Sequence, residues 1–156
     1  MLLLRALLAF LALPAVVAGI VPLVLLPEDR WRVQGTFAGW PVLGSGLLVL
    51  LICVHDFYVF GKGTLAPWDP PKRLVTDGLY KFVRNPMYVA VVCIVAGWGL
   101  ITGSYLLASY AVFLVVGFHV RVVVYEEPKL AQQFPADWLP YSGRVNRWLP
   151  TLSHKS

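Results

Sequence analysis

Four long apolar segments dominate the chain, and short polar stretches separate them. The segments are residues 2–26, 38–60, 86–101 and 105–124. A helix that crosses a bilayer needs about 20 apolar residues, within a range of about 17 to 25. The first, second and fourth segments meet that length, and the third is at its short limit. The pattern therefore predicts an all-α integral membrane protein of about four transmembrane helices.

The first segment has two interpretations. It begins MLLLRALLAF, and residues 16–18 (Val-Val-Ala) would serve as the cleavage site of a secretory signal peptide. However, the apolar run continues to Leu26, which is longer than the usual core of such a peptide. We favour a retained spanning helix that is kinked at Pro14 and Pro22, because membrane helices tolerate proline.

The connections predict how the helices are joined. Only Thr102-Gly103-Ser104 separates the third segment from the fourth, which indicates a tight antiparallel hairpin. The connection over residues 60–86 is rich in glycine and proline, which is typical of an ordered loop with short turns. Beyond residue 124, tryptophan and tyrosine are interleaved with arginine, a pattern that favours short helices at the membrane surface. The whole chain, residues 1–156, is predicted to form a single domain.

Composition supports a lipid environment. Hydrophobic residues make up 58% of the chain, charged residues make up 13%, and the mean hydropathy is +0.71. A soluble domain of average composition carries about a quarter charged residues, so an ordinary soluble domain is excluded. The two cysteines, Cys53 and Cys93, lie in separate apolar segments. Their spacing matches no zinc or redox motif, so we expect packing roles and no metal site.

The placement of charge predicts an orientation. The net charge is +5, and the positive residues gather in the 60–86 connection and in the residues that follow 120. Cytoplasmic loops of membrane proteins carry an excess of lysine and arginine. We therefore expect a multi-pass protein whose loop, C-terminal segment and both termini are cytoplasmic. No nucleic-acid recognition motif accompanies the charge, so the bilayer is the expected partner and nucleic acid is not.

Polar residues gather near the predicted cytoplasmic ends of the segments, where ionisable groups often mark a functional site. They are His55, Asp56, Arg84, Asn85, His119, Arg121, Glu126 and Glu127. For His55 and Asp56 a second explanation has equal weight, since side chains near helix ends also extend toward water without any further role.

Asn85-Pro86 has the composition of a helix start, because asparagine is a favoured N-cap and proline suits the first helical position. A helix start beside Arg84 would also suit an anion, so capping and anion binding both remain open. Farther along, Pro128 disfavours helical geometry at Glu127 and predicts that the fourth helix ends there. The adjacent Glu126 and Glu127 would then either cap a short helix or accept hydrogen bonds from ribose hydroxyls or an ammonium group.

Two further residue types have structural and functional explanations. Tyr80 and Tyr88 flank the polar groups, where tyrosines commonly anchor a protein at the membrane surface. Their rings would also suit a cationic ligand such as a sulfonium. Gly97 and Gly99 lie within the third segment, without a strand–turn–helix pattern around them. They therefore predict close helix packing.

Three sequence blocks resemble motifs of the isoprenylcysteine carboxyl methyltransferase and phospholipid methyltransferase superfamily. They are KRLVTDGLYKFVRNPMY (residues 72–88), YEEPKL (125–130) and YSGRVNRWLP (141–150). The blocks occur in the family's order and span roughly the last hundred residues. The resemblance implies a helical membrane bundle in which S-adenosyl-L-methionine enters from the cytosol and a lipid-like substrate arrives through the bilayer.

The resemblance also implies roles for particular residues. Arg121 would contact the substrate, which is a prenylcysteine carboxylate or a phospholipid amine in this superfamily. If the acceptor is an amine, a base must remove a proton. The candidates are His119 and the two glutamates, and His119 has the more suitable unperturbed pKa. Asn85 stands where the family has histidine and cannot titrate, so a proton-transfer role is not expected there. The resemblance implies that the cofactor is bound by Lys72, Leu74, Val75, Tyr80, Asn85, Pro86, Tyr88, Glu126 and Glu127. We add Arg84 to this set as the cation beside the helix start.

Two other functions compete with the enzyme. A non-enzymatic four-helix scaffold or lipid-binding partner subunit would explain the basic face but not the paired glutamates. A transporter or pore would need polar residues across the membrane depth, whereas here they lie at one level. The sequence favours the methyltransferase and leaves the methyl acceptor and the oligomeric state open.

Overall fold

The computed structural model describes residues 11–29, 32–60 and 73–151, and every regular element within them is helical. The all-α prediction is confirmed for these residues, while residues 2–10 of the first predicted span lie outside them. In chain order the elements are π-helix η1 (Leu11–Ile20), α2 (Val21–Glu28), α3 (Gly39–Phe60), 3-10 helix η2 (Gly78–Lys81), α4 (Pro86–Thr102), α5 (Tyr105–Arg121), π-helix η3 (Val122–Glu126), α6 (Glu127–Gln133) and α7 (Pro135–Arg144).

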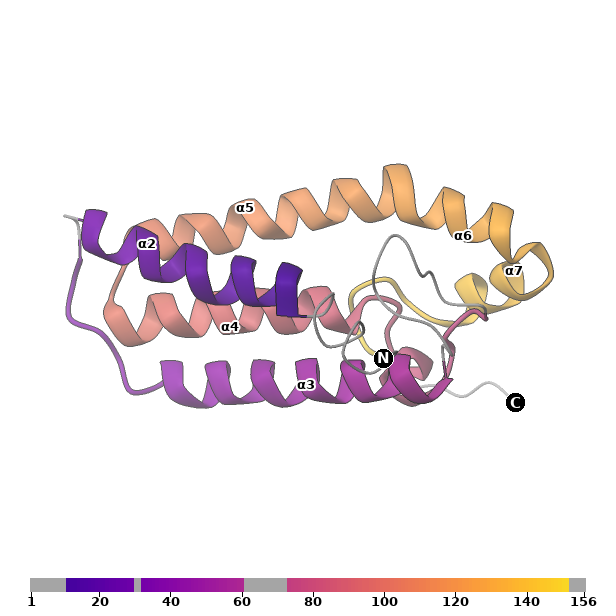
Figure 1. Cartoon of the computed structure of the whole chain (residues 1–156), viewed down its shortest axis with the longest axis horizontal. Helices are drawn as coiled ribbons and strands as arrows, with labels where there is room; N and C mark the ends of the chain where they lie inside the picture. Colours follow the sequence, from indigo (N-terminus) through magenta and orange to yellow (C-terminus); the bar gives the residue numbers. More distant parts are fainter. Residues whose placement is uncertain (1–10, 30–31, 61–72, 152–156) are drawn as a thin grey trace.

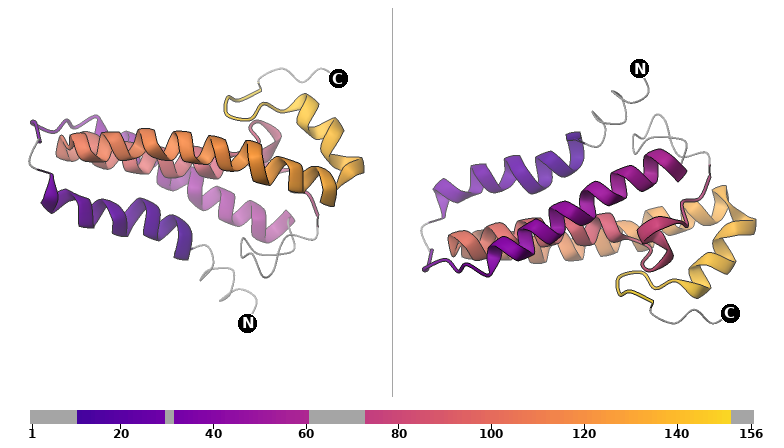
Figure 2. Two further views of the ribbon diagram at one scale, coloured as in Figure 1. Left: turned by 90° about the horizontal axis from the view of Figure 1, so that it is seen from above. Right: turned by 90° about the horizontal axis from the view of Figure 1, so that it is seen from below.

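Helices α3, α4 and α5 run antiparallel to their neighbours along the long axis of the molecule (Figure 1). The turn between α4 and α5 lies at one end, together with the close of α2 and the start of α3; we call this the turn end. The start of α4, the end of α3, α6 and α7 lie at the other end, which we call the α7 end. Figure 2 shows the η1–α2 helix on the opposite side of the bundle from α7.

Two described helices are long and apolar enough to cross a membrane. One window lies in α3 (Gly39–Asp56), and the other lies in the continuous helix Tyr105–Gln133, which has 29 residues. The apolar helices Pro14–Glu28 and Pro86–Thr102 are shorter. The predicted second and fourth spans therefore have the required length, whereas α4, with 17 residues, is at the short limit.

Close approach of backbones explains how α4 packs between its neighbours. A Cβ atom at Gly97 would lie 2.6 Å from Cβ of Leu43, and one at Gly46 would lie 2.9 Å from the carbonyl oxygen of Ala90. A Cβ atom at Gly99 would lie 3.4 Å from the amide nitrogen of Ala108 in α5. The predicted close packing at Gly97 is thus confirmed, because any larger residue there would push α3 away. At Gly99 a Cβ atom would be at ordinary van der Waals distance from α5.

The predicted tight hairpin between α4 and α5 is also confirmed. Gly103 adopts φ +64°, a left-handed conformation that glycine accepts without steric cost. Ser104 then caps α5 by accepting the amide hydrogen of Leu107 at 3.1 Å. The buried Asp29 joins this turn from the end of α2, since its carboxylate accepts hydrogen bonds from the Ser104 hydroxyl and from the Leu106 amide. These bonds hold the first helix to the hairpin.

The prediction that the helix ends at Glu127 is wrong. Glu127 has helical dihedrals (φ −63°, ψ −45°), and the helix continues through Pro128 to Gln133. The physical reason is a change of register, because η3 is a π-helix in which the Glu127 amide donates to the carbonyl of Val122, five residues earlier. Pro128 then lies in the first turn of α6, where its missing N–H and fixed φ are tolerated.

Candidate functional site

A cavity of about 320 Å³ lies at the α7 end, at the lower limit of typical small-ligand sites. Pro86 is buried at the first position of α4 and does not line the cavity, nor does His119. Lys72 lies outside the described residues. The other predicted site residues all line the cavity: Leu74, Val75, Tyr80, Arg84, Asn85, Tyr88, Arg121, Glu126 and Glu127.

The loop that carries Tyr80 is fixed by Asp56 at the end of α3. Asp56 is 4% exposed, and its carboxylate accepts the Leu79 amide hydrogen at 2.9 Å. Gly78 has φ +63°, and a Cβ atom there would lie 2.0 Å from Oδ2 of Asp56, so only glycine fits this contact. The neighbouring His55 side chain is 71% exposed, in keeping with extension toward water. The two residues therefore differ: Asp56 orders the loop and His55 lies at the surface.

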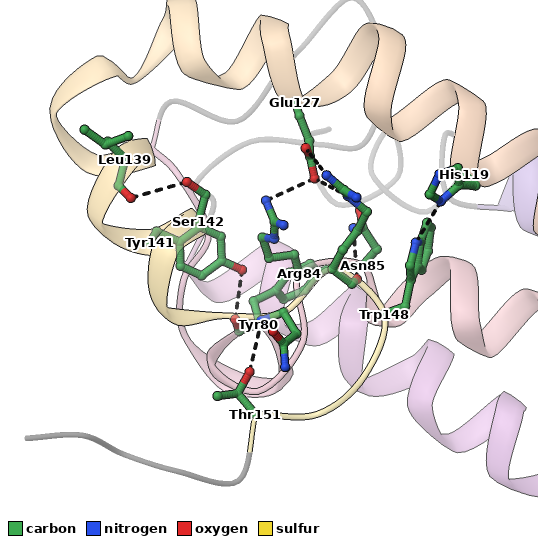
Figure 3. A network of polar contacts seen from close by, with 12 residues as sticks. Tyr80, Arg84, Asn85, His119, Glu127, Leu139, Tyr141, Ser142, Trp148 and Thr151 are labelled. Atoms are coloured by element: carbon green, nitrogen blue, oxygen red, sulfur yellow. Dashed lines mark hydrogen bonds and ion pairs between the residues drawn. The ribbon is translucent and has the colours of Figure 1, made fainter.

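Two buried tyrosines join this loop to α7. The Tyr141 hydroxyl donates to the backbone carbonyl of Tyr80 at 2.8 Å (Figure 3). Burial raises the pKa of the Tyr141 hydroxyl, and burial followed by the nearby Cys53 raises the pKa of the Tyr80 hydroxyl well above its ordinary value. Both phenols are therefore neutral at physiological pH, and Tyr141 keeps the proton that its hydrogen bond requires.

Glu127 is the centre of the main ion-pair cluster. Arg84 Nη1 lies 3.0 Å from its Oε1, and Arg147 binds both carboxylate oxygens, with Nε to Oε1 at 2.7 Å and Nη2 to Oε2 at 2.8 Å. Burial raises the pKa of the Glu127 carboxyl, but the Arg147 hydrogen bonds and the charges of both arginines outweigh it and leave the pKa lowered. Glu127 is therefore ionised at neutral pH, within a paired arrangement that is geometrically specific.

These contacts hold the segment of residues 145–151, which we call the C-terminal strap, against the start of α4. The Arg84 amide donates to the Asn146 carbonyl at 2.9 Å, and the Thr151 amide donates to the Phe82 carbonyl at 2.7 Å. Asn85 does occupy the N-cap position of α4, but its side chain makes no capping bond. Its Nδ2 donates instead to the Arg147 carbonyl at 3.2 Å. Sequence reasoning gave Arg147 no role, because its partner lies twenty residues away.

Arg84 carries a donor without an acceptor. Its guanidinium lies 5.6 Å from the centre of the Trp138 ring. Its Nε is buried and has no hydrogen-bond partner among the residues that the structure describes. A buried donor without an acceptor is costly, and the ion pair with Glu127 and the contact with Trp138 hold the guanidinium in this position. The aromatic contact with Trp138 was also missed from the sequence, which gave that residue only a membrane-surface role.

A second polar group connects α4 to the end of α5. The Tyr88 hydroxyl donates to Oε1 of Glu126 at 2.5 Å. The Arg121 Nε lies 2.8 Å from the same oxygen and 3.1 Å from the Tyr88 hydroxyl. Arg121 is therefore charge-paired with Glu126, although the resemblance implied that it faces a substrate.

His119 lies beside the cavity rather than in its wall. The indole Nε1 of Trp148 donates to its Nδ1 at 3.1 Å (Figure 3). This bond makes Nδ1 an acceptor and leaves the proton of a neutral imidazole on Nε2. Neither nitrogen of His119 is then available as a base unless Trp148 moves. Within the described ranges, no group of three or more histidine, cysteine, aspartate or glutamate side chains comes together to hold a metal.

Over the described residues, the fold and the cavity define a class: a helical bundle with two helices long enough to cross a membrane and a small-ligand cavity at one end. The model of the phospholipid methyltransferase family matches residues 36–137, and the chain belongs to this family. The family resemblance inferred from the sequence blocks is thereby confirmed.

A curated relative extends the comparison. The chain is similar to Methanethiol S-methyltransferase 1 of Bradyrhizobium diazoefficiens, with 29% identity over 144 residues. The match covers 80% of this chain and 47% of the relative, so the chain spans about half the length of the curated relative it matches. No solved structure matches the chain.

Proposed function

We propose that this protein is an S-adenosyl-L-methionine-dependent methyltransferase whose acceptor is a membrane-embedded amphiphile. Two findings support the proposal: membership of the phospholipid methyltransferase family, and the cavity in which the described predicted cofactor residues, apart from Pro86, come together. The observation that carries it is the convergence of Glu126, Glu127 and Arg84 from segments far apart in sequence on one cavity.

The residues of the cavity fit the chemical groups of this cofactor. The positively charged guanidinium of Arg84, which lines the cavity, suits the carboxylate of the methionine portion. The carboxylates of Glu126 and Glu127 suit an ammonium group or ribose hydroxyls. Aromatic side chains in the wall, such as Tyr88 and Trp138, suit a positively charged sulfonium. The cavity thus offers a complementary group for each charged part of the ligand.

The reaction needs alignment more than acid–base power. When bound, S-adenosyl-L-methionine supplies a methyl group on a positively charged sulfur; a lone pair of the acceptor forms the new bond to carbon, and the carbon–sulfur electron pair returns to sulfur. The walls of the cavity hold the reactants in line, which can supply about 7 to 11 kcal/mol of the barrier. They also exclude water, which strengthens the electrostatic interactions within the site.

The acceptor determines what Arg121 and His119 must do. A prenylcysteine carboxylate would have to compete with Glu126 for Arg121. A phospholipid amine must lose a proton, and His119 would accept it only after Trp148 releases Nδ1. The name of the Bradyrhizobium relative adds a third class of acceptor, a thiol. A thiol also loses its proton, and its lower pKa makes that loss easier.

The proposal includes a membrane arrangement. All four apolar helices, including the two shorter ones, are proposed to span the bilayer, with the α7 end in the cytoplasm. Residues 105–124 then lie in the membrane, and Glu126 and Glu127 lie just beyond it. In this orientation the polar cavity opens where a water-soluble cofactor is present, and the acceptor enters from the lipid.

The first test is binding of S-adenosyl-L-methionine to protein purified in lipid nanodiscs, measured by isothermal titration calorimetry. Glu126→Gln/Glu127→Gln should raise the Kd at least about tenfold, which corresponds to about 1.4 kcal/mol. Arg84→Met should weaken binding in the same direction, because the partner for the ligand carboxylate is lost.

A matched control is Glu28→Gln, which makes the same chemical change on an exposed residue at the turn end of α2. It should bind the cofactor like the unaltered protein. The proposal fails if folded wild-type protein does not bind the cofactor, and the scaffold hypothesis then gains weight. Binding that the double variant retains at full strength would remove the glutamates from the site.

A further inference from the structure

The cavity extends beyond the polar cluster to the other side of the bundle. Its wall includes Trp138 and Tyr141 of α7, and it also includes Pro14 and Val17 of η1. Figure 2 shows these two helices on opposite sides of the molecule. A single cavity therefore reaches from the α7 side, where the polar residues gather, to the first helix.

The chemistry of the wall changes along this path. On the η1 side the lining residues are Pro14, Val17, Val91 and Phe118, all of which are apolar. None of these four lining side chains carries a charge. Farther along α5 and η3, the charges of Arg121 and Glu126 compensate each other, because the two side chains form an ion pair. The η1 side therefore favours an uncharged apolar group over a headgroup.

One side chain joins the two parts. The Tyr88 ring packs against Phe118, with 4.4 Å between the ring centres, while its hydroxyl bonds Glu126. A molecule seated against Phe118 and Val17 would therefore meet the polar cluster at Tyr88. That arrangement suits two ligands that enter from opposite sides and meet in the middle.

The position of η1 is fixed by a specific bond. The Tyr110 hydroxyl of α5 donates to the backbone carbonyl of Val17 at 3.2 Å. In the π-helical pattern of η1, this carbonyl would accept an amide hydrogen from residue 22, but Pro22 has none. Tyr110 therefore supplies the donor that proline lacks and holds Val17 at the cavity.

We propose that η1 forms the acceptor subsite, in which Val17, Pro14, Val91 and Phe118 bind the apolar part of the methyl acceptor. The inference rests on the proposed function and adds the residues that select the acceptor. Pro14 and Val17 lie outside residues 36–137, the part that matches the family model. The choice of acceptor can therefore differ between members of the family while the cofactor side is retained.

The test compares Val17→Phe with Val16→Phe, a neighbouring change on the exposed side of the same helix. In lipid nanodiscs, an alkyl diazirine photoprobe is cross-linked to each variant, and labelled peptides are mapped by mass spectrometry. Val17→Phe should reduce labelling of residues 14–18 and 118–122 about tenfold, because the ring fills the space of the alkyl chain. Val16→Phe should label like wild type, and Val17→Ala, which leaves space, should retain or increase labelling.

The Kd for S-adenosyl-L-methionine, measured on the same samples, separates this inference from the proposed function. Unchanged cofactor binding with labelling that depends on Val17 supports both. Labelling that depends on Val17 in a protein that binds no cofactor retains the apolar subsite and refutes the methyltransferase. Equal labelling of Val17→Phe and wild type overturns the subsite, as does loss of labelling in the well-folded Val17→Ala variant.

The acceptor itself is then identified with an activity series. Alkanethiols of increasing length and phosphatidylethanolamine are offered to wild type and to Val17→Phe. The variant should raise KM at least about tenfold for acceptors with long chains while the KM for the cofactor stays unchanged. A rise in both KM values would instead place Val17 on the cofactor side and contradict the assignment.

Discussion

At the scale of single residues, Glu127 and Glu126 are neighbours in the chain with different partners. Glu127 is bound by Arg84 and Arg147, and through Arg147 it holds the C-terminal strap. Glu126 is bound by Tyr88 and Arg121 and faces α4 and α5. Glu126 ends the π-helix η3 and Glu127 follows it, and both residues line the cavity. The two glutamates should therefore have separable effects.

The ionisation of Glu127 should control the strap. Its pKa is lowered in the folded protein, so its contribution is fully present above the unfolded carboxyl value of about 4.3 and is lost as pH falls through the lower folded pKa. Hydrogen exchange of residues 145–151, corrected for the intrinsic rate, should show constant protection from neutral pH to about 5 and loss below about 4.

Two variants check the assignment of that transition. Glu127→Gln should lower strap protection at neutral pH and remove the acid transition, because the amide cannot titrate and leaves both arginines without a carboxylate. Glu126→Gln, next to it in sequence, should retain both the protection and the transition. An acid transition that persists in Glu127→Gln would assign it to another group.

At the scale of elements, both π-helical segments contribute to the cavity wall. η1 supplies Val17, and η3 supplies Val122 and Glu126. A π-turn inserts an extra residue into the hydrogen-bonding pattern and rotates the side chains that follow, and such turns are frequent at functional sites. In this protein both are accompanied by proline, Pro14 within η1 and Pro128 just after η3.

The contact between α3 and α4 depends on missing side chains. Gly46→Val would place a Cβ atom 2.9 Å from both the Ala90 carbonyl oxygen and the side chain of Ile94. We expect a loss of roughly 1–3 kcal/mol in the free energy of unfolding, which is typical of overpacking. Thermal unfolding in detergent, measured by circular dichroism, should show a lower Tm.

The control for this prediction is Gly44→Val in the same helix. A Cβ atom there would meet nothing within 4 Å, so the change in unfolding free energy should stay within about 0.5 kcal/mol. Equal destabilisation by both variants would mean that valine disfavours the helix itself, and would refute the packing explanation.

At the scale of the whole molecule, the proposed orientation predicts which end reacts with a reagent that cannot cross the membrane. Phe37 at the turn end is 84% exposed, and Leu139 at the α7 end is 76% exposed. In a Cys53→Ala/Cys93→Ala background, Phe37→Cys should react with an impermeant maleimide in intact cells. Leu139→Cys should react only after the membrane is opened. The reverse pattern would show that the orientation is opposite to the proposed one. Labelling of both positions in intact cells would place them on the same side of the membrane and contradict three crossings between them.

Hydrophobic patterning was sufficient to predict much of the fold. Three of the predicted apolar segments correspond to α3, α4 and α5. The starts of α4 and α5 coincide with the predicted residues, and α3 starts one residue later than predicted. The agreement is close because hydrophobic periodicity reports on local structure. Asn85-Pro86 and Gly103 likewise marked a helix start and a helix end. The end of α5 was mispredicted, because a proline rule that looks at neighbouring residues does not foresee a change of helical register.

The sequence by itself determined the helical class, the family and nine of the side chains that line the cavity. Only the tertiary structure showed that Arg147 forms an ion pair with Glu127 and that the Trp148 indole donates a hydrogen bond to His119. The structure likewise showed that Asp56 fixes the loop that carries Tyr80. It also showed that the cavity reaches Val17, outside the family match. Helices and motifs follow from contacts between residues close in sequence, whereas these pairings join segments twenty or more residues apart. Such pairs are fixed only when helix packing brings the segments together.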